Sequence, residues 1–200
     1  MAYIETIPEA DAAGAVAEIY ETDRENIGRL PSFTRAFSLR PELYKYWRQL
    51  NGEIKERMDL RRYELATLAA ARRLRSSYCA LAHGAILADQ FMDAEAVRAV
   101  AIDHHAAGLD EVDVAVMDLA DKVADDATTV TEADIDRLRS LGLSDADVID
   151  VVSAAAARCF FSKMLDGLGV DPEAIYKEWL DPELLDALTV GRPIEAAQRD

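Results

Sequence analysis

The sequence predicts an all-α protein, and three observations carry this prediction. Apolar residues recur at the three-to-four spacing of a helix through most of the chain, and no segment keeps the two-residue alternation of a strand. Glycine, proline and capping residues separate the helical segments. Half of the 200 residues are apolar, which is enough for one sizeable core. We therefore expect a single helical domain over residues 1–188 and a polar tail or oligomerisation arm over residues 189–200.

The first 40 residues predict two helical segments. Residues 9–27 alternate small apolar side chains with acidic ones at helical spacing, which predicts a first helix. Gly28 and Pro31 then break the chain. Phe33 and Phe37, four residues apart, indicate a short helical turn whose rings dock on the core.

A further helix is predicted from Pro41 to Lys55, with the proline in the first helical position that suits it. Its apolar stripe consists of Leu43, Tyr44, Trp47, Leu50 and Ile54. An aromatic stripe at helical spacing indicates core packing rather than a ligand-binding surface.

Residues 61–90 predict the helix pair around which we expect a multi-helix orthogonal bundle to be built. Two Ala-rich helices meet at Arg75–Ser77, and Asp59 is placed to cap the first. The small residues that would let the two helices approach closely are Ala66, Ala69, Ala70, Ala80 and Ala82.

The rest of the chain predicts helices of unequal length. They lie at about residues 94–101, 112–123, 132–141, 144–167, 172–179 and 182–188. Thr131 and Asp134 have the spacing of a capping box. Two alanine clusters, at 69–71 and 154–157, are each followed by an arginine, and close helix packing explains both clusters. The adjacent His104 and His105 fall near a break at Gly108, where we expect them to cap a helix or face solvent, pointing in different directions.

The charge distribution excludes several classes of partner. The formal net charge is −16, and residues 110–200 hold 22 of the 38 acidic side chains but only 8 of the 22 basic ones. Such a chain repels phosphate backbones and anionic lipid, so we expect neither nucleic acid nor membrane as a partner. The first residues show no basic segment followed by an apolar one, which favours a cytoplasmic protein.

Cysteine and histidine are scarce. Cys79 and Cys159 are too few for a disulfide framework and indicate reduced, intracellular thiols. The three histidines match no standard zinc spacing, so we expect no metal site and no cofactor.

Cys79 is the strongest candidate for a reactive group. It follows Ser76, a natural N-cap, by three residues and therefore lies in the first turn of a helix, where free N–H groups and the helix dipole favour a thiolate. Three arginines just before the turn add positive potential. His83 lies four residues later on the same face and leans back over Cys79, which is the spacing of a base and its nucleophile.

Glu64 is the expected third member of this group. At roughly 1.5 Å per residue, an antiparallel helix pair leaves Glu64 and His83 offset by about 6 Å along the axis, which a glutamate side chain nearly spans. Glu64 then orients His83, and His83 exchanges a proton with Cys79. Spacing alone leaves another interpretation open, in which Cys79 and His83 are inert core residues and Glu64 lies on a solvated face.

These residues resemble the redox motif of the carboxymuconolactone decarboxylase and alkyl hydroperoxidase D (AhpD) superfamily, in particular its peroxidase-related branch. The family motif is a glutamate followed some twelve residues later by Cys-x-x-Cys-x-x-x-His, and the matching positions here are Glu64, Ser76, Cys79 and His83. The similarity covers most of residues 28–170. It implies an AhpD-like helical fold, a homo-oligomer, and no metal or organic cofactor.

The same resemblance implies roles for individual residues. Cys79 is expected to attack a hydroperoxide, His83 and Glu64 to relay protons, and Tyr78 to be a further relay member. Ser76 departs from the family pattern, because it occupies the place of the resolving cysteine and a hydroxyl cannot form a disulfide.

The function expected from the sequence is therefore a one-cysteine peroxidase. A sulfenic acid on Cys79 would be reduced by a small thiol, a partner protein or Cys159. Two alternatives stay open: a decarboxylase-like enzyme acting on a small carboxylated lactone without need of Cys79, and a non-catalytic oligomeric helical protein.

Overall fold

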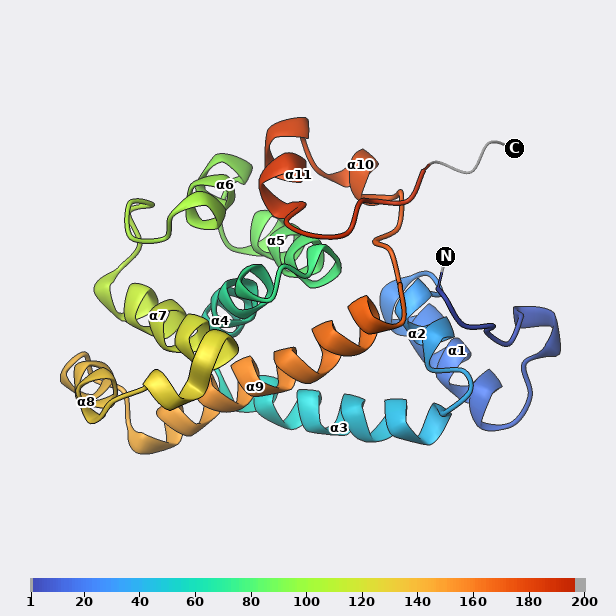
Figure 1. Cartoon of the computed structure of the whole chain (residues 1–200), viewed down its shortest axis with the longest axis horizontal. Helices are drawn as coiled ribbons and strands as arrows, with labels where there is room; N and C mark the ends of the chain where they lie inside the picture. Colours follow the sequence, from blue (N-terminus) through green and yellow to red (C-terminus); the bar gives the residue numbers. More distant parts are fainter. Residues whose placement is uncertain (1, 197–200) are drawn as a thin grey trace.

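The computed structural model describes residues 2–196, and over these residues the chain is helical and has no strand (Figure 1). The all-α prediction is confirmed. The α-helices are α1 (Ala15–Ile27), α2 (Ser32–Ala36), α3 (Pro41–Arg57), α4 (Leu60–Arg73), α5 (Ser77–Gln90), α6 (Ala94–Ile102), α7 (Glu111–Asp126), α8 (Glu132–Ser140), α9 (Asp145–Gly167), α10 (Tyr176–Trp179) and α11 (Pro182–Leu188). Short 3₁₀ turns lie at Glu9–Asp11 and Ala127–Thr129.

The predicted pair α4–α5 lies at the centre of the fold (Figure 1). Helix α4 packs against α5, α7 and α9, and every residue from Tyr63 to Ala71 is buried. A helix buried on all sides needs small residues where its neighbours approach, which is why alanines fill this segment. Asp59 caps α4 as expected, since its Oδ1 accepts a hydrogen bond from the Arg62 N–H at 3.0 Å.

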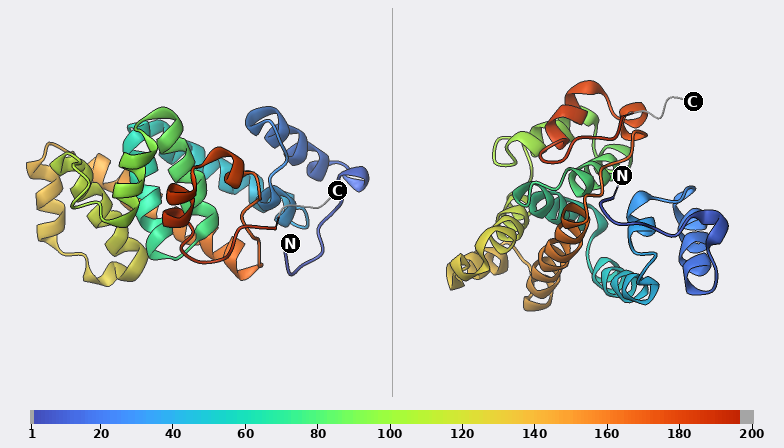
Figure 2. Two further views of the ribbon diagram at one scale, coloured as in Figure 1. Left: turned by 90° about the horizontal axis from the view of Figure 1, so that it is seen from above. Right: turned by 45° about the vertical axis from the view of Figure 1, so that its right-hand side comes forward.

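Helices α1 and α2 pack beside α3 near one end of the molecule (Figure 2). The buried carboxylate of Asp23 in α1 joins all three helices. It accepts hydrogen bonds from the hydroxyls of Thr34 and Tyr44, the latter at 2.6 Å, and lies 2.9 Å from Arg48. Helix α3, held in this way, also packs along α9.

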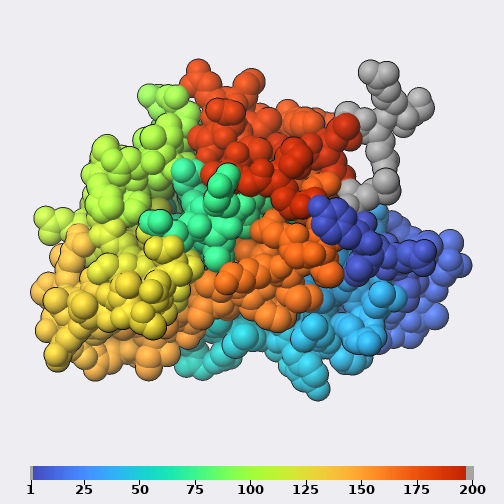
Figure 3. Space-filling model, in the orientation of Figure 1, coloured from blue at the N-terminus to red at the C-terminus, as the bar shows by residue number. Residues whose placement is uncertain are grey.

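The C-terminal segment covers the other side of α5. Helix α11 packs on α5 and α6, and Figure 3 shows this red segment lying against their green surface. Beyond α11, the Gly191 N–H donates to Ser77 Oγ at 2.7 Å, and the Glu195 N–H donates to the Pro172 carbonyl at 2.9 Å. The described part of the predicted tail thus folds back on its own chain, while residues 197–200 lie outside the described residues. An oligomerisation role for the tail, like the expected homo-oligomer, stays a prediction.

Two local predictions were wrong. The first helix does not run from residue 9, because Gly14, at φ +55°, interrupts the chain and α1 begins only at Ala15. In α3, Leu43 and Leu50 are 40% and 54% exposed instead of buried. Each leucine directly precedes a residue that is turned towards the rest of the protein, Tyr44 or Asn51, while the leucine itself faces solvent. The face of α3 that packs on α1 and α9 is therefore narrower than the apolar pattern indicates.

The helices predicted for the C-terminal half are confirmed except at one segment: the helix predicted from residue 172 begins only at Tyr176, because residues 171–175 form a loop. Thr131 and Asp134 form a capping box, and Ser144 caps the long α9, which ends at Gly167. Within residues 2–196, no helix is both long and apolar enough to cross a lipid bilayer.

Candidate active site

Cys79 lies at a cavity of about 430 Å³ between α3, α4, α5 and α9. Its side chain is 1% exposed, and the cavity reaches it together with Glu64 and His83. The structure therefore brings the three expected residues to one cavity. An inert core cysteine would have no such access, so this geometry argues against the interpretation in which the motif is only packing.

Ser76 occupies the N-cap position of α5, but its hydroxyl makes no capping hydrogen bond. Its Oγ is buried without a hydrogen-bond partner among the described residues. The side chain lies beside Asp166 of α9, whose pKa is raised by burial and lowered in part by this hydroxyl. The expected cap is therefore wrong, because the serine side chain turns away from the helix end and towards α9.

Glu64 and His83 make the contact that the sequence predicts. Glu64 Oε2 lies 2.5 Å from His83 Nδ1, and both side chains are buried. The other glutamate oxygen, Oε1, accepts a hydrogen bond from Lys55 Nζ at 3.3 Å. The second imidazole nitrogen, Nε2, makes no hydrogen bond to any residue between 2 and 196, so it is the nitrogen left to exchange a proton.

The surroundings favour an ionised carboxylate at Glu64 and a neutral imidazole at His83. Burial raises the pKa of Glu64, but His83 and Lys55 outweigh this effect and the pKa is lowered, so the carboxylate is ionised at neutral pH. Burial and the positive charge of Arg158 lower the pKa of His83, against the opposing effect of Glu64. His83 is therefore neutral and able to accept a proton.

Arg158 of α9 is the residue that sequence reasoning missed. Its Nη1 lies 3.7 Å from Cys79 Sγ, and its Nη2 donates to the Tyr63 hydroxyl at 3.3 Å. The guanidinium also lies over the rings of Trp47 and Phe161, at 5.9 and 5.6 Å from their centroids. A buried arginine held by a sulfur, a phenol and two aromatic faces is placed to stabilise negative charge on that sulfur.

No carboxylate of residues 2–196 lies within ion-pair distance of Arg158, although its side chain is buried. Burial alone would lower its pKa, but Cys79 and Tyr63 more than offset this effect and the pKa is raised. The sequence did hold a signal. Positions 154, 155, 161 and 162, at helical contact distance from Arg158, carry no acidic residue, so a cation in this apolar stretch needs an anionic partner from elsewhere.

Tyr78 belongs to a different network. Its hydroxyl donates to Glu173 Oε1 at 2.6 Å and accepts from Ser32 Oγ at 3.1 Å. Arg29 Nη1 binds the same glutamate oxygen at 3.0 Å. The ring of Tyr78 lines the cavity, but no hydrogen bond among the described residues joins its hydroxyl to the Cys79 group, so the structure does not bring the expected relay member together with the rest. Glu173 follows a proline in a loop and carried no sequence signal.

Aromatic rings form one wall of the cavity. Phe33, Tyr44, Trp47 and Phe161 line it, and successive ring centroids lie 4.8–6.1 Å apart. Tyr44 and Trp47 are buried as the apolar stripe predicts, yet they also face the space next to Cys79. These two residues therefore belong to the core and also line the cavity, so the expectation that the stripe serves core packing rather than a ligand surface is wrong for them.

Cys159 does not pair with Cys79. Both cysteines are free, and Cys159 is half-buried on the outer part of α9. Burial raises the pKa of the Cys159 thiol. A protonated thiol is a poor nucleophile towards a sulfenic acid, so the structure gives Cys159 no feature of a resolving residue.

Comparison with known proteins finds likeness only at the level of structure: no protein family and no curated protein matches the sequence. The fold is similar to that of an uncharacterised peroxidase-related protein with an AhpD core from Ralstonia eutropha JMP134, with 20% identity, a TM-score of 0.79, and 96% of this chain and 98% of that chain covered. A peroxidase-related protein from Silicibacter sp. TM1040 is similar over 88% of this chain and 93% of that chain, with 20% identity and a TM-score of 0.79.

A cysteine-to-alanine variant of the debrominase Bmp8, in complex with 2,3,4-tribromopyrrole, is also similar. It has 14% identity and a TM-score of 0.77, and the match covers 94% of this chain and 100% of that chain. These likenesses show that the chain has an AhpD-like fold, which is the fold that the sequence resemblance implied.

Proposed function

We propose that this protein is a thiol-dependent hydroperoxide reductase in which Cys79 is the reacting group. The observation that carries the proposal is the position of Arg158 Nη1, 3.7 Å from Cys79 Sγ, at a cavity that also holds the Glu64–His83 pair. A buried cation favours the thiolate, and the thiolate is the nucleophilic form of cysteine.

The reaction follows from these charges. Neutral His83 takes the thiol proton, and Arg158 stabilises the thiolate that results. The sulfur attacks the distal oxygen of the hydroperoxide, so an S–O bond forms, the O–O bond breaks, and the sulfur is oxidised to a sulfenic acid. The proton on His83 passes to the departing alkoxide, which leaves as an alcohol. Glu64 keeps the imidazole oriented and stabilises its protonated form.

The cycle needs an external reductant of the thiol class. One thiol condenses with the sulfenic acid and releases water, and a second releases Cys79 as the free thiol and leaves as a disulfide. Ser76 cannot supply either thiol, and the half-buried Cys159 is not bonded to Cys79.

The test is the trapping of a sulfenic acid after one equivalent of cumene hydroperoxide, with mass spectrometry of the intact protein and of its peptides. We expect one trapped group per chain at Cys79, none in Cys79→Ser, and full trapping in Cys159→Ser. Trapping at Cys159 alone, or no reaction within minutes at equimolar peroxide, would contradict the proposal. Turnover of a carboxylated lactone that persists in Cys79→Ala would instead support the decarboxylase alternative.

A second candidate function is the removal of halogen from a flat aromatic ring. The aromatic wall beside Cys79 favours it, as does the likeness in fold to the debrominase Bmp8. In this reaction a hydrogen replaces the bromine, bromide is released, and two external thiols are oxidised to a disulfide. Release of bromide from 2,3,4-tribromopyrrole in the presence of a small thiol, and its loss in Cys79→Ser, would favour this function over peroxide reduction.

A further inference from the structure

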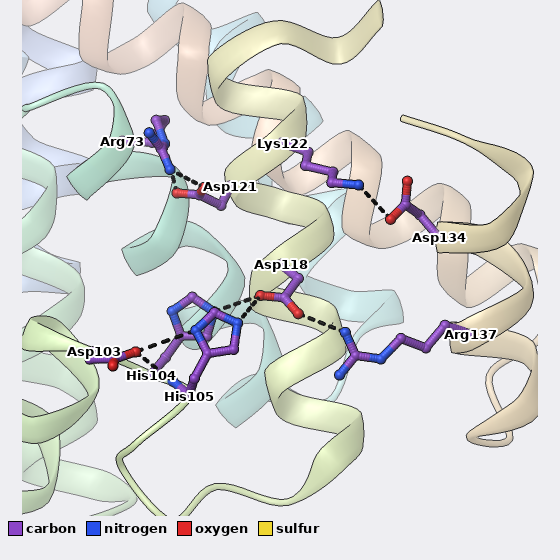
Figure 4. Close-up of polar contacts among 9 residues, drawn as sticks. All are labelled: Arg73, Asp103, His104, His105, Asp118, Asp121, Lys122, Asp134 and Arg137. Atoms are coloured by element: carbon purple, nitrogen blue, oxygen red, sulfur yellow. Dashed lines mark hydrogen bonds and ion pairs between the residues drawn. The ribbon is translucent and has the colours of Figure 1, made fainter. Parts of the chain in front are cut away.

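A second group of titratable side chains lies away from the Cys79 cavity, where the chain leaves α6 and passes α7 (Figure 4). The Nε2 atoms of His104 and His105 lie 2.9 and 2.8 Å from the same oxygen, Oδ1 of Asp118. The expectation that the two adjacent histidines point in different directions is wrong. Helix α6 ends at Ile102, and in the turn that follows both rings face α7 with their centroids 4.1 Å apart.

The remaining contact of His105 suits a metal ligand. On the side away from Asp118, its Nδ1 lies 3.3 Å from Asp103 Oδ1. A histidine that binds a metal through Nε2 commonly donates its Nδ1 proton to a carboxylate in this way, which fixes the orientation of the ring.

The three ligand atoms are already gathered. One ligand atom from each of His104, His105 and Asp118 lies within 4.8 Å of the other two. Ligands about 2.0–2.2 Å from a tetrahedral ion are roughly 3.4 Å apart, so only a small adjustment is needed. The His105 side chain is 59% exposed and free to make it.

The side chain of Asp118 is oriented by a neighbouring arginine. Its second oxygen, Oδ2, accepts a hydrogen bond from Arg137 Nη1 at 2.7 Å, which orients the carboxylate and leaves Oδ1 towards the imidazoles (Figure 4).

The space beside the cluster is open, and the arginines that line it are held by other partners. A hollow of about 490 Å³, bordered by α4 and α7, gives room for water to complete the coordination. Arg73, which lines this hollow, is paired with Asp121, with 2.9 Å between Nε and Oδ1. The other two arginines of the hollow, Arg72 and Arg75, donate to backbone carbonyls of residues 187 and 190.

We propose that His104, His105 and Asp118 form a site for one divalent transition-metal ion, bound through two imidazole nitrogens and one carboxylate oxygen. This ligand set suits Zn²⁺, Ni²⁺ or Cu²⁺ rather than Mg²⁺ or Ca²⁺, which prefer oxygen ligands. The ion would fasten the turn after α6 to α7. It would do so independently of the Cys79 cavity, since the two sites share no residue.

The first test is calorimetric titration of the tag-free full chain with Zn²⁺ and, separately, with Mg²⁺. We expect one tight Zn²⁺ site per chain and no comparable Mg²⁺ site. His105→Ala, an exposed position that does not threaten folding, and Asp118→Asn should each weaken Zn²⁺ binding at least tenfold. The matched controls Cys79→Ser and His83→Gln should leave it unchanged, because they alter the other place where a thiol or imidazole could bind the metal.

The second test identifies the ligands directly. With one equivalent of Cu²⁺, electron paramagnetic resonance should show superhyperfine coupling to two nitrogens in the natural chain and to one in His104→Ala. Zn²⁺ binding that is unaffected by His105→Ala and Asp118→Asn, or the absence of a micromolar site in the natural chain, would overturn the proposal.

Discussion

Two places in this chain bring imidazole and carboxylate groups into contact. The two places differ in burial and in the charges nearby. His83 and Glu64 are buried, face a cavity, and have the cation Arg158 beside them. At the α6–α7 turn, Asp118 receives two imidazoles in a partly open position, and His105 is the more exposed of the two. The same two functional groups therefore meet under opposite conditions of solvation.

The difference shows how environment assigns chemistry to a common pair. In the cavity, burial and a neighbouring cation keep the imidazole neutral and leave one nitrogen to move a proton. At the turn, two nitrogens converge on one carboxylate oxygen, which is the arrangement that we propose as a metal site. Each of the following changes alters one of these conditions and not the other.

The largest effect is expected from Arg158→Met, which keeps the volume of the side chain and removes its charge. A hydrogen bond to a charged group contributes about 1.5–3 kcal/mol, so the rate constant for oxidation of Cys79 by hydroperoxide at pH 7 should fall roughly tenfold to a hundredfold. Stopped-flow kinetics with a sulfenic acid trap measures this rate. Arg158→Lys, which keeps the positive charge, should retain most of the oxidation rate. Equal losses of rate in both variants would contradict this prediction, because the rate would then depend on the shape of the arginine side chain and not on its charge.

Glu64→Gln should slow the same oxidation by about tenfold, because the amide oxygen still orients His83 but no longer stabilises its protonated form. The matched change at the other pair, Asp118→Asn, should leave the oxidation rate within twofold of the natural chain. If both substitutions slowed oxidation equally, the two pairs would not be independent and the comparison would fail.

A smaller effect is expected from Asp103→Asn at the turn. The amide oxygen can still accept the Nδ1 proton of His105 but without its charge, so Zn²⁺ affinity should fall several-fold. Competition against a chromophoric chelator is sensitive enough to measure such a change. An unchanged affinity would show that Asp103 does not support His105.

The smallest effect concerns stability against pH. The pKa of His83 is lower in the folded chain than its ordinary value of 6.5, so the unfolded chain binds more protons as the pH falls. Stability is therefore full above about pH 7.5 and falls as the pH drops through 6.5, by no more than about 0.8 kcal/mol at pH 6. Urea denaturation of the natural chain and of His83→Gln measures the difference, and a natural chain no more sensitive than the variant would contradict the assignment of a neutral His83.

Much of the fold could be predicted from the sequence, because interactions between residues close in the chain determine where helices begin and end. Asp59 and the Thr131 capping box mark helix ends through short-range hydrogen bonds, and both act as predicted. The contact of Glu64 with His83 was likewise accessible, since the length of the turn between two antiparallel helices fixes their register.

What the sequence did not reveal depends on contacts across the fold. Arg158 reaches Cys79 from 79 residues away, and its role depends on how α9 crosses α4 and α5. Tyr78 turns towards Glu173 for the same kind of reason, since a loop 95 residues further on supplies the carboxylate. The direction of His104 and His105 was mispredicted because it depends on where α6 ends and on the distant Asp118.

The central claim is that Arg158 supports Cys79 as the reacting nucleophile, and the most direct measurement is the alkylation rate of Cys79 at pH 7 in a Cys159→Ser background, with and without Arg158→Met. The account predicts that Arg158→Met slows alkylation roughly tenfold or more, because the buried cation no longer stabilises negative charge on the sulfur. An equal rate in the two proteins would contradict the account, because Arg158 would then contribute nothing to the chemistry proposed for Cys79.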